Sequence, residues 1–371
     1  MLIILWITFT LMLLSMAYPF FLLFLPKIRS EKGKKIKVTD AVSVILFSYN
    51  NREYLENKIN RLLEELRAFR SYELIIVDNE STDGSRIILD RFASYPNIKI
   101  IFNCQLKSVA CSMNIGVRHA RYEYIIMCDL RQELSVNSLR ILVQSLQDKR
   151  VGAVSACLCS RDKSGKVSPV RRIENMIKKL EGRSGNLIGV YGPFYGIRKS
   201  CYTPIPEHIL LEDLYLSLSI LSTHQIIFRQ DCLIIDNDFT SVYNIRRAKK
   251  YVKGLIQLIQ EKKLMSKIRL MQLFMLLWHK YFRLFIPLLI LLNFIFLSIL
   301  TRSEIYLLIA LFMFTIAALI PDLSMIHSKL KDILRINFYY LVLVPIILFQ
   351  PVLMFFNRLL RGREISMGTP G

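Results

Sequence analysis

Short apolar runs alternate with helical patterns through the middle of the chain. Runs with the length of buried strands cover 42–47, 73–77, 97–102, 123–128 and 151–159. Between the first two of these runs, the leucines and isoleucines of residues 52–70 fall on one face of a helix. Strands that alternate with helices in this way predict an α/β fold with a mixed, mostly parallel sheet flanked by helices.

Acidic residues stand where two of these strands end. Asp78 follows Leu-Ile-Ile-Val and Asp129 follows Ile-Ile-Met-Cys, and a third acidic site, Glu212-Asp213, lies far downstream. Ligands of open α/β sheets bind just outside the carboxyl ends of the strands, so we expect Asp78 and Asp129 to face one crevice. A carboxylate there can hold a ribose, a base or a phosphate-bound metal. The placement predicts a nucleotide-activated substrate.

Longer apolar stretches flank the α/β region. They cover residues 2–25, 285–300, 305–320 and 336–356. A membrane span needs about 20 mainly apolar residues, so the first and last stretches are long enough and the middle two are borderline. No basic residues precede the first stretch and no small-residue cleavage site follows it, which favours an uncleaved anchor over a signal peptide. The basic run after it predicts that the following domain lies in the cytoplasm.

These patterns predict one N-terminal and two or three C-terminal transmembrane helices around the α/β domain. The predicted organisation is a transmembrane anchor at 1–26, a basic juxtamembrane linker at 27–40, a cytoplasmic catalytic domain at 41–262, an interfacial amphipathic helix at 263–283, transmembrane helices at 284–357 and a tail at 358–371.

The formal net charge of +21 is concentrated beside the apolar stretches. Basic residues at such positions attract anionic lipid headgroups and anionic substrates. No nucleic-acid-binding motif accompanies them, so we expect membrane lipids as partners and no nucleic acid.

The stretch from about 41 to 260 resembles the catalytic domain of glycosyltransferase family 2, in the membrane-integrated branch of cellulose, chitin and hyaluronan synthases and bacterial polysaccharide glycosyltransferases. The matching motifs are Ser48-Tyr49-Asn50, the run from Val77 to Ser85, Lys107 with Asn114-Ile115-Gly116, Asp129-Leu-Arg131, Glu212-Asp213, and a degraded QxxRW motif from Arg247 to Tyr251. The resemblance implies the GT-A fold, which is Rossmann-like, and inverting sugar transfer.

The resemblance also implies roles for individual residues. The nucleotide-sugar would be bound by Ser48, Asn50, Asp78, Asp83, Lys107, Asp129 and Arg131. Asp213, with Glu212 as its neighbour or alternate, would be the general base that accepts a proton from the acceptor hydroxyl. Arg247, Lys250 and Tyr251 would contact the acceptor and the diphosphate. The residues alone leave structural alternatives open, because Asp78 to Gly84 also suits a helix-capping turn and Glu212-Asp213 an acidic helix start.

A divalent cation, Mg²⁺ or Mn²⁺, is expected to neutralise the leaving diphosphate, with Asp129 as its ligand. This chain departs from the family at Arg131, where a second acid or an asparagine is usual. A guanidinium cannot bind a metal, although it can bind phosphate directly. Glu133 is a substitute ligand.

The expected function is therefore a membrane-bound inverting glycosyltransferase, located in the inner cell membrane as a multi-pass protein. Its donor would be a nucleotide-sugar, expected to be a UDP-sugar, and its acceptor a lipid-linked sugar or a glycan. It would act in envelope, capsule or exopolysaccharide assembly, with other polysaccharide-assembly proteins as partners. Two alternatives stay open: transfer to a polyprenyl phosphate, and a non-catalytic nucleotide-sugar-binding subunit of a synthase.

Overall fold

The structure is a computed structural model that describes residues 2–28, 41–103, 108–161, 169–237, 241–302 and 306. The chain divides into two compact units. The larger unit is Pro19–Asp238 with Gln257–Leu276. The smaller unit is Met1–Tyr18, Phe239–Ile256 and Leu277–Gly371.

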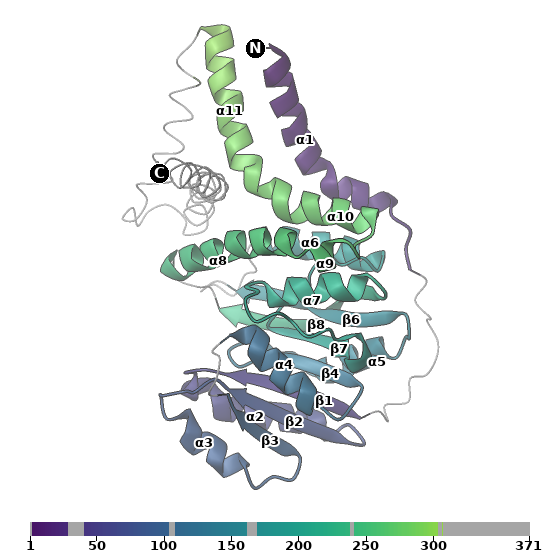
Figure 1. The fold of residues 1–371 in the computed structure, drawn as a ribbon, viewed down its shortest axis with the longest axis vertical. Coiled ribbons are helices and arrows are strands. Elements are labelled where there is room, and N and C mark those ends of the chain that lie inside the picture. Colours follow the sequence, from purple (N-terminus) through teal and green to yellow (C-terminus); the bar gives the residue numbers. More distant parts are fainter. Residues whose placement is uncertain are drawn as a thin grey trace, which may run out of the picture. The chain divides into compact units, whose positions relative to one another are not determined.

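The larger unit is built on one sheet of eight strands in the order β3-β2-β1-β4-β7-β6-β8-β5 (Figure 1). The strands are β1 (Val42–Ser48), β2 (Tyr72–Asp78), β3 (Ile98–Phe102), β4 (Tyr124–Asp129), β5 (Glu133–Leu134), β6 (Val151–Arg161), β7 (Phe194–Arg198) and β8 (Gln225–Asn237). The first four are parallel, β6 and β8 are parallel, and β7 and β5 pair antiparallel with their neighbours. The predicted mixed, mostly parallel α/β sheet is confirmed.

Strand β1 lies between β2 and β4, and its register fixes the edge of the sheet that carries the acidic residues. Ser48 is opposite Asp78 on one side, and Phe47 is opposite Asp129 on the other. Both faces of β1 are buried, which explains why its sequence is a continuous apolar run rather than an alternating one.

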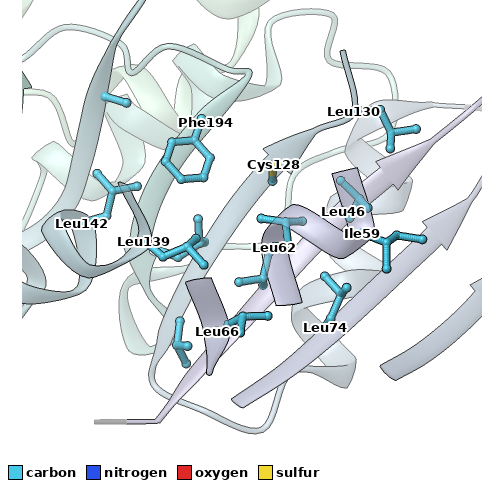
Figure 2. Packing of buried hydrophobic residues seen from close by; sticks show 14 of the residues in the cluster. Leu46, Ile59, Leu62, Leu66, Leu74, Cys128, Leu130, Leu139, Leu142 and Phe194 are labelled. Atoms are coloured by element: carbon cyan, nitrogen blue, oxygen red, sulfur yellow. The ribbon is translucent and has the colours of Figure 1, made fainter. Parts of the chain in front are cut away.

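Helices cover both faces of this sheet. They are α2 (Arg52–Leu66), α3 (Ser85–Phe92), α4 (Val109–His119), α5 (Ser138–Leu146), α6 (Pro169–Arg183) and α7 (Glu212–Leu221). The unit also contains α9 (Lys262–Met265), α10 (Leu270–Leu276) and a 3-10 turn at Lys199–Cys201. Leucines at helical spacing on α2 and α5 pack against alternate residues of the strands, such as Leu46 and Leu74 (Figure 2).

Helix α4 approaches β1 on the side that carries Ile45. A Cβ atom at Gly116 would lie 2.6 Å from Ile45 Cγ2, so only glycine permits this approach. The glycine of the Asn114-Ile115-Gly116 motif therefore has a packing role.

The smaller unit contains most of the remaining described helices. These are most of α1 (Leu2–Phe24) and α8 (Ser241–Gln260), a π-helix (Leu277–Phe282) and α11 (Arg283–Thr301). Among the described residues, no helix combines the length and apolarity that crossing a bilayer requires. The membrane segments predicted at 1–26 and 284–357 stay predictions, and most of the latter lies outside the described residues.

Two element predictions were wrong. The segment 263–283, predicted as one interfacial helix, is divided among α9, α10 and the π-helix. The apolar pattern of residues 186–197 also predicts a strand, interrupted by Gly192 and Pro193. Only Phe194–Arg198 forms one, because the backbone of 188–191 is bonded to side chains of other elements instead of a neighbouring strand. The other strands and helices predicted between residues 41 and 262 are confirmed to within a few residues at their ends.

Candidate functional site

Ser48, Asp78 and Asp129 end three neighbouring strands at one edge of the sheet. Because β2 and β4 flank β1, Asp78 and Asp129 are separated by two strand spacings, about 10 Å. Ser48 lies between them with its hydroxyl buried, and this hydroxyl has no hydrogen-bond partner among the described residues. The structure thus brings the strand-end residues to one edge, as the sequence predicted.

The loops that follow β1 and β2 (48–51 and 78–85, here the donor-side loops) are joined by their own side chains. Asp78 is buried, and its carboxylate accepts hydrogen bonds from the Ser81 amide at 2.9 Å and the Ser81 hydroxyl at 2.6 Å. The Asn50 amide donates to the Ser81 hydroxyl at 3.0 Å, and Asn50 Oδ1 accepts from the Thr82 amide at 2.8 Å. Asn50 adopts φ 49°, in the left-handed region that asparagine tolerates.

Asp83 links the starts of two helices. Its carboxylate accepts from the Arg52 amide at 2.8 Å, from the Ser85 amide at 3.0 Å and from the Ser85 hydroxyl at 2.6 Å. Desolvation acts to raise the pKa of this carboxyl, but the hydrogen bonds from Ser85 and Arg52 outweigh it and the pKa is lowered. Asp83 therefore bonds the first amides of α2 and α3, while Asp78 and Asn50 hold the turn before α3. Nucleotide binding by all three residues stays a prediction.

A buried network beside these loops was missed by the sequence analysis. Asn79 Oδ1 accepts hydrogen bonds from Asn103 Nδ2 at 2.8 Å and from the Ser112 hydroxyl at 2.7 Å. All three residues are buried, and they connect the ends of β2 and β3 to α4. The sequence did carry a signal for this network, because Asn79 and Asn103 are polar residues that directly follow apolar strands.

The loop after β4 is anchored at both of its ends. The Asp129 amide donates to the Pro193 carbonyl at 2.9 Å, and the buried Lys58 ammonium of α2 donates to the Gln132 carbonyl. The side chain of Arg131, between these anchors, is exposed.

The Asp129 carboxyl is partly buried in an environment of mixed charge. Burial raises its pKa to about 6, and the negative charges of Asp236 and Asp213 act in the same direction. The positive charges of Arg131 and Lys58 oppose them. Asp129, Asp213 and Asp236 are therefore close enough to interact electrostatically, and we call them the acidic set.

Asp213 lies in the first turn of α7, with Glu212 before it. The Asp213 Oδ1 atom accepts from the Leu214 amide at 2.9 Å, and a Cβ at Gly192 would lie 3.2 Å from Asp213 Oδ2. Since Pro193 bonds to Asp129, the Gly192-Pro193 turn contacts both acids. The downstream acidic pair is thus at the same edge of the sheet as Asp129.

Asp236 completes the acidic set and was not predicted. It is buried near the end of β8, opposite Ser160 of β6. It follows Leu-Ile-Ile, the same signal of an acid after an apolar run that identified Asp78 and Asp129.

Four predicted residues cannot be placed in this site. Lys107 lies outside the described residues, and the side chain of Arg247 is not described. Lys250, which is exposed, and Tyr251, which is partly buried, are on α8 in the smaller unit. Their acceptor and diphosphate roles stay predictions.

A cation site is only partly supported. Among the described residues, no group of three or more histidine, cysteine, aspartate or glutamate side chains is placed to hold a metal ion. Asp129 is the best candidate ligand, since a cation would relieve the repulsion within the acidic set. Glu133, the substitute ligand considered above, is exposed on β5.

Residues 43–204 match the family model described as glycosyl transferase family 2. The match covers less than half of the 371-residue chain. The chain is 27% identical over 128 residues to the glycosyltransferase GlyG of Streptococcus pneumoniae serotype 4, which is 34% of this chain and 42% of that protein. It is 22% identical over 167 residues to the poly-beta-1,6-N-acetyl-D-glucosamine synthase of Staphylococcus epidermidis, which is 43% of this chain and 40% of that protein.

A third relative is the putative teichuronic acid biosynthesis glycosyltransferase TuaG of Bacillus subtilis, 33% identical over 89 residues, which cover 24% of this chain and 34% of TuaG. The chain thus spans less than half the length of these curated relatives. Among solved structures, the chain is similar to the mannosyltransferase PcManGT of Pyrobaculum calidifontis, which was solved in complex with GDP-Man and Mn²⁺. The two superpose with a TM-score of 0.66 at 17% identity, and the match covers 91% of this chain and 97% of PcManGT. The likeness confirms the GT-A fold.

Proposed function

We propose that this chain belongs to glycosyltransferase family 2 and transfers a sugar, with inversion, from a nucleotide-sugar to an acceptor hydroxyl. The observation that carries the proposal is the meeting of strand-end and downstream acids at one edge of the sheet. Asp129 bonds to Pro193, and Asp213 lies against Gly192, so a single turn positions both carboxylates. An inverting transfer needs one carboxylate at the diphosphate and another within reach of the attacking hydroxyl.

Asp213 is assigned as the general base, with Glu212 as its neighbour. Its position in the first turn of α7 leaves the carboxylate at the surface of the unit, partly exposed. Asp129 is assigned to the diphosphate side, where Mg²⁺ or Mn²⁺ would supply charge neutralisation when bound. Arg131 provides a positive charge on the same loop, as a direct contact to phosphate oxygens.

The donor-side loops are assigned to the nucleoside. The Ser48 hydroxyl, buried without a partner among the described residues, is a polar group available to a bound ribose or base after a small movement of the loop. Asp78 keeps acceptor capacity beyond its bonds to Ser81, because a carboxylate has about four lone-pair sites. We expect a UDP-sugar as the donor.

The acceptor is proposed to be lipid-linked or a growing glycan in bacterial envelope, capsule or exopolysaccharide assembly, alongside other assembly proteins. The names of the similar proteins from Staphylococcus and Bacillus support this setting. We further propose that the chain works at the inner membrane, in the membrane-integrated branch of the family, with its catalytic domain in the cytoplasm. Support comes from the apolar stretches of the sequence and from exposed side chains on α1 such as Trp6, 66% exposed, and Phe24, 87% exposed.

The test is nucleotide release by the detergent-purified full chain across a panel of UDP-, GDP- and CMP-sugars, with Mg²⁺, Mn²⁺ or EDTA. Turnover of one donor that is lost in Asp213→Asn is the expected result. Asp90→Asn is the matched control, because Asp90 is an exposed acid on α3 outside the site. Activity that survives EDTA would assign the role of the cation to Arg131.

The open alternatives give distinct results in the same assay. A polyprenyl-phosphate acceptor needs no general base, so turnover with such an acceptor would survive Asp213→Asn. Donor binding by calorimetry without turnover of any donor or acceptor would instead indicate a non-catalytic subunit.

A further inference from the structure

A basic cavity lies at the end of the sheet opposite the acidic set. It has a volume of about 360 Å³ and is formed where four connections of the larger unit meet. Its lining includes Gln225, the first residue of β8, whereas Asp236 stands near the other end of that strand. On the neighbouring β6, Val151 lies opposite Gln225 and Ser160 opposite Asp236, so about nine strand steps, roughly 30 Å, separate the two positions and the cavity is distinct from the candidate active site.

The lining has the charge of an anion site. Lys149 and Arg150 of one connection and Arg269 of another are exposed cations, His224 also lines the cavity, and none of the ten described residues that line it is acidic. Arg150 is held by Asp148 outside the lining, with Nη2 2.6 Å from Oδ2. Three cations around a small volume favour a phosphate group.

The floor of the cavity is rigid and polar. Gln272 is buried, and its Nε2 donates to the Leu221 carbonyl at 2.9 Å and to Asn186 Oδ1 at 3.3 Å, while its Oε1 accepts from the Arg269 amide at 3.2 Å. This one side chain joins the start of α10 to the end of α7 and to the turn after α6. The cavity is therefore preformed.

A second observation indicates that the ligand also donates a hydrogen bond. The Oε1 atom of Gln225 is buried and has no hydrogen-bond partner among the described residues. Leaving such an acceptor unsatisfied costs about 1–3 kcal/mol in general, so a hydroxyl from a ligand would be favourable there once a small rotation of the Gln225 side chain uncovers the atom. The lining suits a phosphate ester that carries a neighbouring hydroxyl group.

The end of α1 passes beside the rim of the cavity. The Ile28 amide donates to the Arg183 carbonyl at 2.9 Å, and Arg183 Nη2 donates to the Leu23 carbonyl at 3.3 Å. Arg183 directly precedes the lining residues Ser184 and Gly185. The side chains of Leu23 and Phe24 are exposed, so large apolar groups lie on the chain that leads to a basic cavity.

We propose that this cavity binds the phosphate and a hydroxyl of a glycerophosphate-type headgroup, with an anionic phospholipid as the ligand. Basic pockets beside apolar segments recognise headgroups in this way. A soluble glycerol phosphate has the same chemistry, and the experiment separates the two sources. The proposal does not depend on the sugar-transfer function.

The probes are dihexanoyl-phosphatidylglycerol, dihexanoyl-phosphatidylcholine and glycerol 1-phosphate, titrated into the detergent-purified full chain by calorimetry. We expect the anionic lipid to bind at least about tenfold more tightly than the zwitterionic one. Equal affinity for glycerol 1-phosphate and the anionic lipid would identify a soluble ligand. No preference of the chain for either anionic probe over phosphatidylcholine would overturn the proposal.

The variant Lys149→Gln/Arg269→Gln removes two lining cations, and Lys262→Gln/Lys263→Gln is its control with the same change of charge. Lys262 and Lys263 are exposed on α9 and do not line the cavity. The lining variant should lose about 30-fold in affinity for the anionic lipid, and the control less than about threefold. Equal losses would mean general surface attraction and would contradict a built site.

Gln225→Met tests the hydroxyl contact at nearly constant side-chain volume. Dihexanoyl-phosphatidic acid lacks the headgroup glycerol and its hydroxyls. The variant should therefore lose the preference for dihexanoyl-phosphatidylglycerol over dihexanoyl-phosphatidic acid, while it still binds the phosphate of both lipids. An unchanged preference would contradict the hydroxyl contact. A nucleotide donor, by contrast, should bind all these variants as it binds the unmodified chain.

Discussion

The two sides of the candidate site use the same residue types in opposite ways. On the donor side, Asp78 and Asp83 are bonded to amides and hydroxyls of their own loops. In the acidic set, Asp129 interacts with two other carboxylates, and burial raises its pKa. The hydrogen-bonded carboxylates on the first side stabilise the fold, whereas ionised Asp129 on the second side is kept at a cost to it.

This difference shows how one sheet edge can combine a fixed frame with reactive groups. Satisfied carboxylates hold two loops in one geometry, which preorganises whatever binds between them. A carboxylate that is desolvated by burial and lies near other negative charges stores unfavourable energy that a cation or a substrate can release. Substitutions on the two sides should therefore change different observables.

The largest effect is expected when Asp213 is substituted, where turnover should fall while donor affinity stays almost unchanged. Asp213→Asn should lower turnover by about 10²–10⁴-fold, the usual contribution of a general base, and leave donor affinity within about twofold. The midpoint of thermal unfolding should stay close to that of the unmodified chain. A parallel loss of donor affinity and turnover would place Asp213 on the donor side and remove the contrast.

The next effect is the pH dependence of Asp129. Because its folded pKa is about 6, the ionised form needed for a cation is lost below that pH, and Mn²⁺-dependent donor binding should fall about tenfold per pH unit there. Donor binding by Asp129→Asn should be weak and independent of pH, as measured by calorimetry between about pH 5 and pH 8.

Stability should change in the opposite direction at Asp129. A carboxyl whose pKa is raised on folding stabilises the fold fully below its unfolded pKa near 4, and this contribution is lost as pH rises through about 6. Asp129→Asn should therefore be more stable than the unmodified chain at about pH 8, by about 1–2 kcal/mol, or several degrees in Tm. Greater stability of the unmodified chain at that pH would show that burial and the neighbouring charges do not disfavour ionised Asp129 in the folded chain.

A smaller effect is expected at Lys58, which holds the loop after β4. Lys58→Met keeps the buried methylene chain but leaves the Gln132 carbonyl without this donor, at a cost of about 1–3 kcal/mol in chemical denaturation. Removing the positive charge should also move the pH midpoint of donor binding upward, because Lys58 lowers the pKa of Asp129. An unmoved midpoint would mean that Lys58 acts on the loop alone. The exposed Lys149 of the same chain, changed to Met, is the control.

The smallest effect is expected at Asp83. Asp83→Ala removes the caps of α2 and α3 and should cost about 0.5–2 kcal/mol of unfolding free energy. Because folding lowers the pKa of Asp83, its contribution is present above pH about 4 and is lost as pH falls through the folded pKa, so the variant and the unmodified chain should converge in acid. A constant difference down to about pH 2 would contradict this linkage.

Local patterns along the chain were enough to predict the strands that carry the site. Apolar runs ending in an acid located Asp78 and Asp129, and the same signal stood at Asp236, although it was not used. Each signal needs only a few neighbouring residues, because burial of a strand and the exposure of its end are set locally. The sequence also left open whether Asp78 and Asp83 bind a ligand or cap helices, since both uses favour the same residues.

Contacts between distant parts of the chain decided the rest. The insertion of β7 between β4 and β6 brings Gly192 and Pro193 to the acidic set, and no residue spacing predicts that order. The basic cavity arises in the same way, from four connections that are far apart in sequence. The sequence by itself determined which residues end the buried strands. Only the tertiary structure decided which of those ends meet, because strand order and register depend on hydrogen bonds and packing between residues that the chain separates widely.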